Sequence, residues 1–352
     1  MESNKNKRRF MLFNLQKEGK GVSKKHAEQK PGFGRFWSSY RNSFSKLVSV
    51  NIFFVLGNFP ILFLIAALSA VSKNEIYLPL SDLFQNVNGL IQADGGMTPY
   101  KLSLYALEGL QNQTYAPTVI TYVMYGIAAL TLFTFGPVNA STAYIIRNMV
   151  AGEPVFVWND FWYAFRRNIK QALPFGVIDV LINALLVFNV YTLITTTADF
   201  FASVMFWTTI VLSIVYFFMR YYIYVQMVTF KLSVYKIVKN SLNFTLLGLK
   251  RNFAALFGII LLLFFEVFFL FGSGGVLMPL AVAAPLTILF STFAFMKVYA
   301  SYYKIKEIMI DPYRAEHPEE FEDEEPEVEA VMRDDVTERE RLEEVKRRNG
   351  II

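Results

Sequence analysis

Long apolar stretches dominate the middle of this chain and constrain its fold more than any other feature. A membrane-spanning helix needs about 20 mainly apolar residues, and about six segments meet that length. Only 18% of the residues are charged, whereas soluble domains usually carry about a quarter. The segments are Leu47–Val71, Thr118–Ile146, Gln171–Ile194, Phe200–Gln226, Phe253–Phe271 and Val276–Ala300. We therefore expect an all-α membrane protein with about six transmembrane helices.

The distribution of Lys and Arg between the loops predicts the orientation in the membrane. Outside the C-terminal tail, nearly all basic residues lie before Leu47 or in the segments Arg147–Lys170, Lys231–Arg251 and Lys297–Lys306. The loops Ser72–Pro117, Thr195–Asp199 and Gly272–Gly275 hold very few. Because basic loops stay in the cytoplasm, we expect a multi-pass protein of the cell (cytoplasmic) membrane with both termini cytoplasmic.

An aromatic and basic pattern recurs before three of the apolar stretches. Phe36–Trp37 with Tyr40–Arg41 matches Phe161–Trp162 with Phe165–Arg166 at one constant offset, and Arg166–Ile169 matches Lys250–Phe253. This pattern predicts three helical hairpins, each preceded by a cytoplasmic interfacial amphipathic helix. The alternative is that such clusters precede many spans for topological reasons alone. The expected interfacial anchors are Trp37, Arg41, Trp158, Phe161, Trp162, Arg166, Arg167, Lys250 and Arg251.

Both ends of the chain and one loop differ in composition from the membrane domain, predicted at residues 32–313. Residues 1–31 read as a basic disordered arm, either near an anionic leaflet or simply solvated. Residues 314–352 read as an acidic, charged cytoplasmic tail. The outer insertion, residues 72–117, carries two predicted helical faces, at Leu80–Ile91 and Leu104–Leu110, that cap the bundle or offer a docking surface.

Ionisable residues inside apolar spans are costly and are candidates for function. Asp179 and Arg220 lie at a similar depth from the cytoplasmic side, about two turns into their spans. We expect them to face each other or to share a polar cavity, either as a structural pair or as part of an ion or substrate site. Glu266 lies deeper, and we expect it to be protonated or bonded to Asn183 or Asn189.

Other polar features favour packing over chemistry. Gly136 and Pro137 predict a kink in the second span. There is no cysteine, and the two histidines, His26 and His317, lie in the polar ends. No phosphate-binding loop, metalloprotease motif or nucleophile elbow is present. We expect no enzyme activity, no cofactor, no metal and no nucleic-acid partner.

The stretch from Gly136 to Lys170 resembles the YesL family of bacterial integral membrane proteins, a domain of unknown function. Gly32–Phe36 and Asp311–Tyr313 resemble the family more weakly, so the likeness covers roughly Gly32–Tyr313. The chain departs from the family in its long outer loop, Ser72–Pro117, and in its extended basic and acidic ends. It implies a Firmicute-type cytoplasmic membrane and a place beside carbohydrate-uptake systems, and it transfers no catalytic residues. The residues that carry it are Gly136–Pro137, Ala140, Thr142–Ala143, Arg147, Glu153–Pro154, Phe161–Trp162, Phe165, Asn168 and Lys170–Gln171.

Two functions follow as hypotheses. The first is a non-enzymatic accessory or regulatory component of carbohydrate or oligosaccharide uptake, with the lipid bilayer and permease subunits of the importer as partners. The second is a stand-alone small-molecule transporter that uses Asp179, Arg220 and Glu266.

Overall fold

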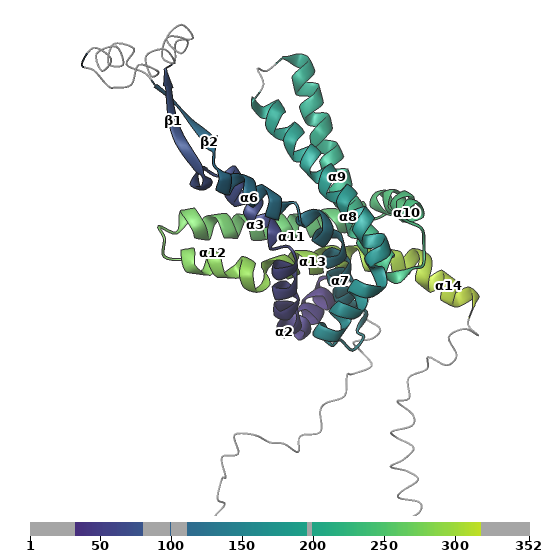
Figure 1. Ribbon diagram of the computed structural model, residues 1–352. Coiled ribbons are helices and arrows are strands. Elements are labelled where there is room, and N and C mark those ends of the chain that lie inside the picture. The colour runs from purple at the N-terminus through teal and green to yellow at the C-terminus, as the bar shows by residue number, and fades with distance from the viewer. Residues whose placement is uncertain (1–31, 80–98, 100–110, 196–198, 318–352) are drawn as a thin grey trace, which may run out of the picture.

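The computed structural model describes residues 32–79, 99, 111–195 and 199–317, and these residues are almost entirely helical (Figure 1). The α-helices are α2 (Phe33–Gly57), α3 (Pro60–Leu68), α6 (Val119–Ala128), α7 (Thr131–Ala151), α8 (Val157–Thr195), α9 (Phe200–Thr229), α10 (Val234–Leu247), α11 (Leu249–Val267), α12 (Met278–Ala284), α13 (Phe290–Ile305) and α14 (Asp311–Glu316). Short 3₁₀ or π segments are η1 (Ala70–Ser72), η2 (Phe268–Gly272), η3 (Pro285–Leu289) and η4 (Lys306–Ile310). The predicted basic arm and nearly all of the predicted tail lie outside the described residues.

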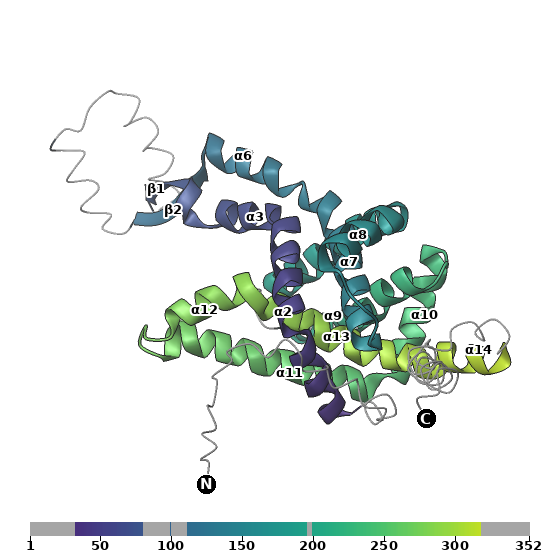
Figure 2. The ribbon, with the colours of Figure 1, turned by 90° about the horizontal axis from the view of Figure 1, so that it is seen from below.

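Three helical hairpins diverge from a common base (Figures 1 and 2). They are α3 with α6, α8 with α9, and α11 with α12 and α13. We call the base the region where α7, the second half of α9 and α13 pack together. In α9, every buried residue lies between Phe218 and Val228, and none lies earlier in the helix. In α8, the last buried residue is Asp179. The outer halves of these helices therefore face their surroundings.

Those outer halves are apolar, which identifies the surroundings as lipid. Side chains such as Val187, Phe200 and Trp207 are 69%, 84% and 65% exposed, and soluble monomers rarely expose such continuous apolar surface. Among the described residues, five helices are long and apolar enough to cross a membrane. A sixth span is counted if α2 and α3 are taken together, although they are bent by 58° at the break before Pro60. The expectation of an all-α, multi-pass membrane protein is confirmed.

The expected interfacial helices are not separate in two of three cases. α2 continues without interruption from Phe33 to Gly57, and α8 from Val157 to Thr195. The first half of α8 contains no glycine or proline before Pro174, so nothing in its sequence ends the helix. Only α10 is distinct, and Gly248 marks the break that follows it.

The described ends of the outer insertion form two strands, which the sequence did not predict. β1 (Lys73–Pro79) pairs antiparallel with β2 (Gln111–Pro117). The Thr118 hydroxyl, which also caps α6, donates to the Ser72 carbonyl at 2.7 Å and fastens the start of the hairpin to the membrane domain. The predicted helical faces at residues 80–91 and 104–110 lie outside the described residues.

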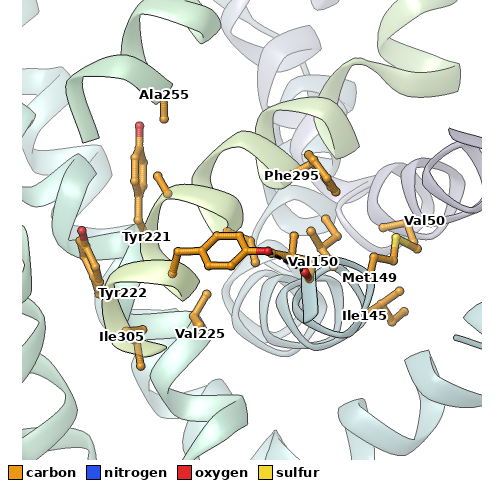
Figure 3. Packing of buried hydrophobic residues seen from close by; sticks show 14 of the residues in the cluster. Val50, Ile145, Met149, Val150, Tyr221, Tyr222, Val225, Ala255, Phe295 and Ile305 are labelled. Carbon is orange, nitrogen blue, oxygen red and sulfur yellow. Dashed lines mark hydrogen bonds between the residues drawn. The ribbon is translucent and has the colours of Figure 1, made fainter. Parts of the chain in front are cut away.

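One buried core joins α2, α7, α8, α9, α10, α11 and α13 at the base (Figure 3). Labelled members come from α2, α7, α9, α11 and α13: Val50, Ile145, Met149, Val150, Tyr221, Tyr222, Val225, Ala255, Phe295 and Ile305. Asn51 in α2 bridges this core to the break between η3 and α13. Its side chain donates to the Pro285 carbonyl at 2.8 Å and accepts from the Ser291 N–H at 2.9 Å. Both ends of the irregular turn thus keep hydrogen-bond partners, as a membrane interior requires.

The recurring sequence blocks place a buried polar residue at one equivalent position. The offsets that align the blocks bring Ser43, Asn168 and Asn252 together, and these are 9%, 8% and 0% exposed. Asn168 donates to the Ala164 carbonyl one turn earlier, whereas Asn252 accepts from Tyr222. The three blocks therefore share a buried polar residue at this position, although the hydrogen bonds of those residues differ.

Candidate functional site

The most strongly constrained polar group in the described part of the chain is the carboxylate of Asp179, which is 0% exposed. On α9, Tyr216, Arg220 and Tyr224 follow one another at intervals of four residues and therefore share a helix face. The Tyr216 hydroxyl donates to Asp179 Oδ1 at 2.8 Å, and the Tyr224 hydroxyl donates to Oδ2 at 2.6 Å. Arg220 Nε lies 2.8 Å from Oδ1, and Asn183 Nδ2 donates to the same oxygen at 2.8 Å.

Four donors thus surround an acceptor that has about four lone-pair positions in total. The predicted contact between Asp179 and Arg220 is present. A buried charge with a full set of partners is tolerated, and removing one partner strands the other. Through these contacts, the cluster joins the middle of α8 to the second half of α9. The sequence analysis did not identify Tyr216 and Tyr224 as partners of Asp179. Their spacing of four residues from Arg220 places them on the same helix face and could have indicated this role.

Arg220 also lines a small cavity between α7, α9 and α13, and most of the surface of that cavity is apolar. The cavity has a volume of about 40 Å³. The guanidinium of Arg220 lies over the ring of Phe135, with Cζ 5.4 Å from the ring centroid. Lys297 of α13 reaches the same cavity. The sequence placed Lys297 in the basic segment at the end of the last span. The structure instead gives it a half-buried position beside Arg220.

Glu266 does not join this site. It lies near the end of α11, and in the described ranges no hydrogen bond or ion pair links it to another side chain. The expected bond from Asn183 is not formed, because the Asn183 amide binds Asp179 instead.

At Gly136 and Pro137 the structure shows a close helix crossing. α7 runs as one helix through both residues, and the break from α6 lies earlier, at Ala129–Leu130. Gly136 meets Gly176 of α8, and a Cβ added to Gly136 would stand 1.9 Å from the Ala172 carbonyl oxygen. Gly136 therefore lies at a contact that has no room for a side chain, and the kink expected at Gly136 and Pro137 stays a prediction.

The expected interfacial anchors divide into buried and exposed groups. Phe161 is 4% exposed and stacks on Phe53, with ring centroids 4.7 Å apart. Trp158 and Trp162 are 64% and 39% exposed. Trp158 and Trp162 share an open groove of about 790 Å³ with Asn159, Tyr163, Arg166 and Arg167. We call these six residues the aromatic–basic surface. Elsewhere, Trp37, Arg41 and Lys250 are exposed, and Arg251 pairs with Glu307 at 3.5 Å.

Two comparisons bear on what these side chains can do: one with the ligand sets that hold metal ions, and one with known proteins. Within the described ranges, no group of three His, Asp or Glu side chains could hold a metal ion. Searches of curated proteins and of solved structures gave no significant match. Residues 116–190, which include the α7–α8 crossing and Asp179 but end before Arg220, match a family of membrane proteins described as "Protein of unknown function, DUF624".

Proposed function

We propose that this protein is a non-enzymatic accessory or regulatory component of carbohydrate or oligosaccharide uptake in the cytoplasmic membrane. The single observation that carries the proposal is the exposed aromatic–basic surface at the start of α8. Trp, Tyr and Arg are the residues most enriched at protein interfaces and at their energetic hot spots. The part of the proposal that links the protein to carbohydrate uptake rests on the resemblance to the YesL family.

The aromatic–basic surface is partly pre-organised for a partner. Arg167 donates to the Tyr163 hydroxyl at 3.1 Å, and its guanidinium lies over that ring. In the described part of the chain, no acidic side chain pairs with Arg166 or Arg167. A basic surface that has no ion-pair partner among the described residues suits an acidic cytoplasmic segment of a permease subunit. Fixing side chains before binding also lowers the entropic cost of association.

Capture from native membranes tests the proposal. The full chain, solubilised in mild detergent, is expected to co-purify permease subunits of an oligosaccharide importer. Trp158→Ala should abolish that capture. Trp207→Ala is the matched control, because Trp207 is 65% exposed, against 64% for Trp158, but lies on the outer half of α9. Recovery of the protein alone, or equal loss in both variants, would contradict the proposal.

A stand-alone small-molecule transporter is the second candidate. The cavity that Arg220 and Lys297 line favours it, since charged groups inside spans commonly mark solute pathways. The full engagement of Asp179 and the separate position of Glu266 weigh against those two residues as its moving parts. Flux assays in proteoliposomes with Asp179→Asn separate the alternatives, because a transport role predicts lost flux with unchanged folding.

A further inference from the structure

Lys297 is a cation without a counter-ion in the described part of the chain. It is half-buried in α13, and its Nζ lies 6.0 Å from the centroid of the Phe217 ring. No hydrogen bond or ion pair engages that Nζ within the described ranges. A weak contact with one aromatic face does not replace the hydration that an ammonium group loses on leaving water.

The nearest acid cannot serve as the missing counter-ion. Asp179 is the acid of the neighbouring cluster, and Arg220 already neutralises its charge. Both of its oxygens are filled by donors from α8 and α9. Counting Asp179, Arg220 and Lys297 together leaves one excess positive charge at the cavity.

The lining of the cavity supplies a further donor. Thr142 of α7 is 2% exposed, and its hydroxyl has no hydrogen-bond partner within the described ranges. Thr142, Arg220 and Lys297 all line the same space. A buried polar group without a partner is costly, and one acceptor-rich guest would relieve several of these groups at once.

The size of the cavity limits that guest. A water molecule needs roughly 10–15 Å³ on the measure for which this cavity has about 40 Å³. The space therefore holds about three small atoms, and a carboxylate group has three non-hydrogen atoms. We propose that the cavity between α7, α9 and α13 is a binding site for a carboxylate group, held by Lys297 and Arg220.

The carboxylate could belong to a small soluble acid or to an acid with a hydrocarbon chain. Lys297 and Phe217 also line a second space, an open and mainly apolar groove of about 780 Å³ among α8, α9, α11 and α13. A chain attached to the carboxylate would lie in that groove. The two sources share the same head group, and the experiment distinguishes them.

The test measures equilibrium binding to the full chain reconstituted in phosphatidylcholine nanodiscs. The probes are radiolabelled acetate, radiolabelled dodecanoate and radiolabelled phosphate. Lys297→Met removes the charge while keeping a side chain of similar length. It should weaken carboxylate binding by roughly tenfold or more, the effect of losing one charge-assisted hydrogen bond. Thr142→Val should weaken binding by a smaller factor.

Lys306→Met is the matched control, because it removes the same charge from η4, away from the cavity. Lys297→Met should melt no lower than the natural protein, since it removes a cation that has no ion-pair partner among the described residues. If the melting temperature of Lys297→Met is not lowered, a loss of carboxylate binding in this variant cannot be due to unfolding.

The binding data distinguish a soluble carboxylate ligand, a carboxylate ligand with a hydrocarbon chain, and the absence of a carboxylate site. Saturable acetate binding that Lys297→Met weakens and Lys306→Met does not supports the site with a soluble ligand. Binding of dodecanoate alone, with the same dependence, supports it with a chain-bearing ligand. No saturable binding of either acid, equal binding by all variants, or binding of phosphate alone overturns the proposal. Binding requires no flux, so the result stands or falls separately from both proposed functions.

Discussion

Gly136 in α7 lies directly against Gly176 in α8. A Cβ added to Gly136 would stand 2.7 Å from the Gly176 Cα, and one added to Gly176 would stand 2.4 Å from the Gly136 Cα. Such an approach is open only to residues without a side chain, and small residues are the usual means by which membrane helices pack closely. The crossing fixes α7, the most buried helix of the base, against the helix that carries Asp179.

Gly136→Ala should destabilise the protein strongly. The new methyl would overlap the backbone of α8, which cannot move aside as a flexible side chain can, so a cost of about 1–3 kcal/mol or more is expected. Thermal unfolding in detergent measures the change. Gly126→Ala is the control, because a Cβ there meets nothing within 4 Å and alanine favours helix. Equal melting of the two variants would contradict the close crossing.

Asp179→Asn should lower stability by about 3–5 kcal/mol, the usual cost of stranding one member of a buried ion pair. The amide would also turn a donor toward hydroxyls that now donate to the carboxylate. Asp199→Asn is the matched control, because Asp199 caps α9 through Oδ1 and asparagine caps a helix equally well.

A double replacement isolates the pair itself. Asp179→Leu combined with Arg220→Met removes both charges and should melt higher than Asp179→Leu alone. If Asp179→Asn unfolds like the natural protein yet loses flux in proteoliposomes, the structural role is wrong and the transporter gains support.

Asn51→Leu should strand two groups at once, the Pro285 carbonyl and the Ser291 N–H. Each buried unpaired group costs about 1–3 kcal/mol, so the melting temperature should fall clearly. Asn58→Leu is the control: its amide donates to the Phe54 carbonyl, which also accepts from the Asn58 N–H. If the melting temperature of Asn58→Leu fell by a similar amount, the two hydrogen bonds of Asn51 would not explain the loss of stability in Asn51→Leu.

The contrast between Asp179 and Asn51 shows what a sequence can predict here. Charge inside an apolar span is conspicuous, and a rise of about 1.5 Å per residue gives its depth, so the contact between Asp179 and Arg220 was predictable. Asn51 is uncharged, and its partners lie 234 and 240 residues away. No period in the sequence encodes a contact at that separation.

Lys297 illustrates a second limit. Basic residues near the ends of spans are normally read as topology signals, and that reading placed Lys297 with Lys304 and Lys306. Which way its side chain points depends on how α13 rotates against α7 and α9, which is decided by packing. The β1–β2 pairing is likewise non-local, because its first residue pair joins Lys73 to Pro117.

The orientation predicted from the basic loops can be tested directly, because the chain contains no cysteine. Val276→Cys places a thiol beside the Gly272–Gly275 turn, at a position that is 80% exposed. Lys236→Cys places one on the exposed face of α10. With basic segments inside, an impermeant maleimide should label Val276→Cys in intact cells and Lys236→Cys only after lysis. The reversed pattern would place the aromatic–basic surface outside the cell, where cytoplasmic permease segments could not reach it.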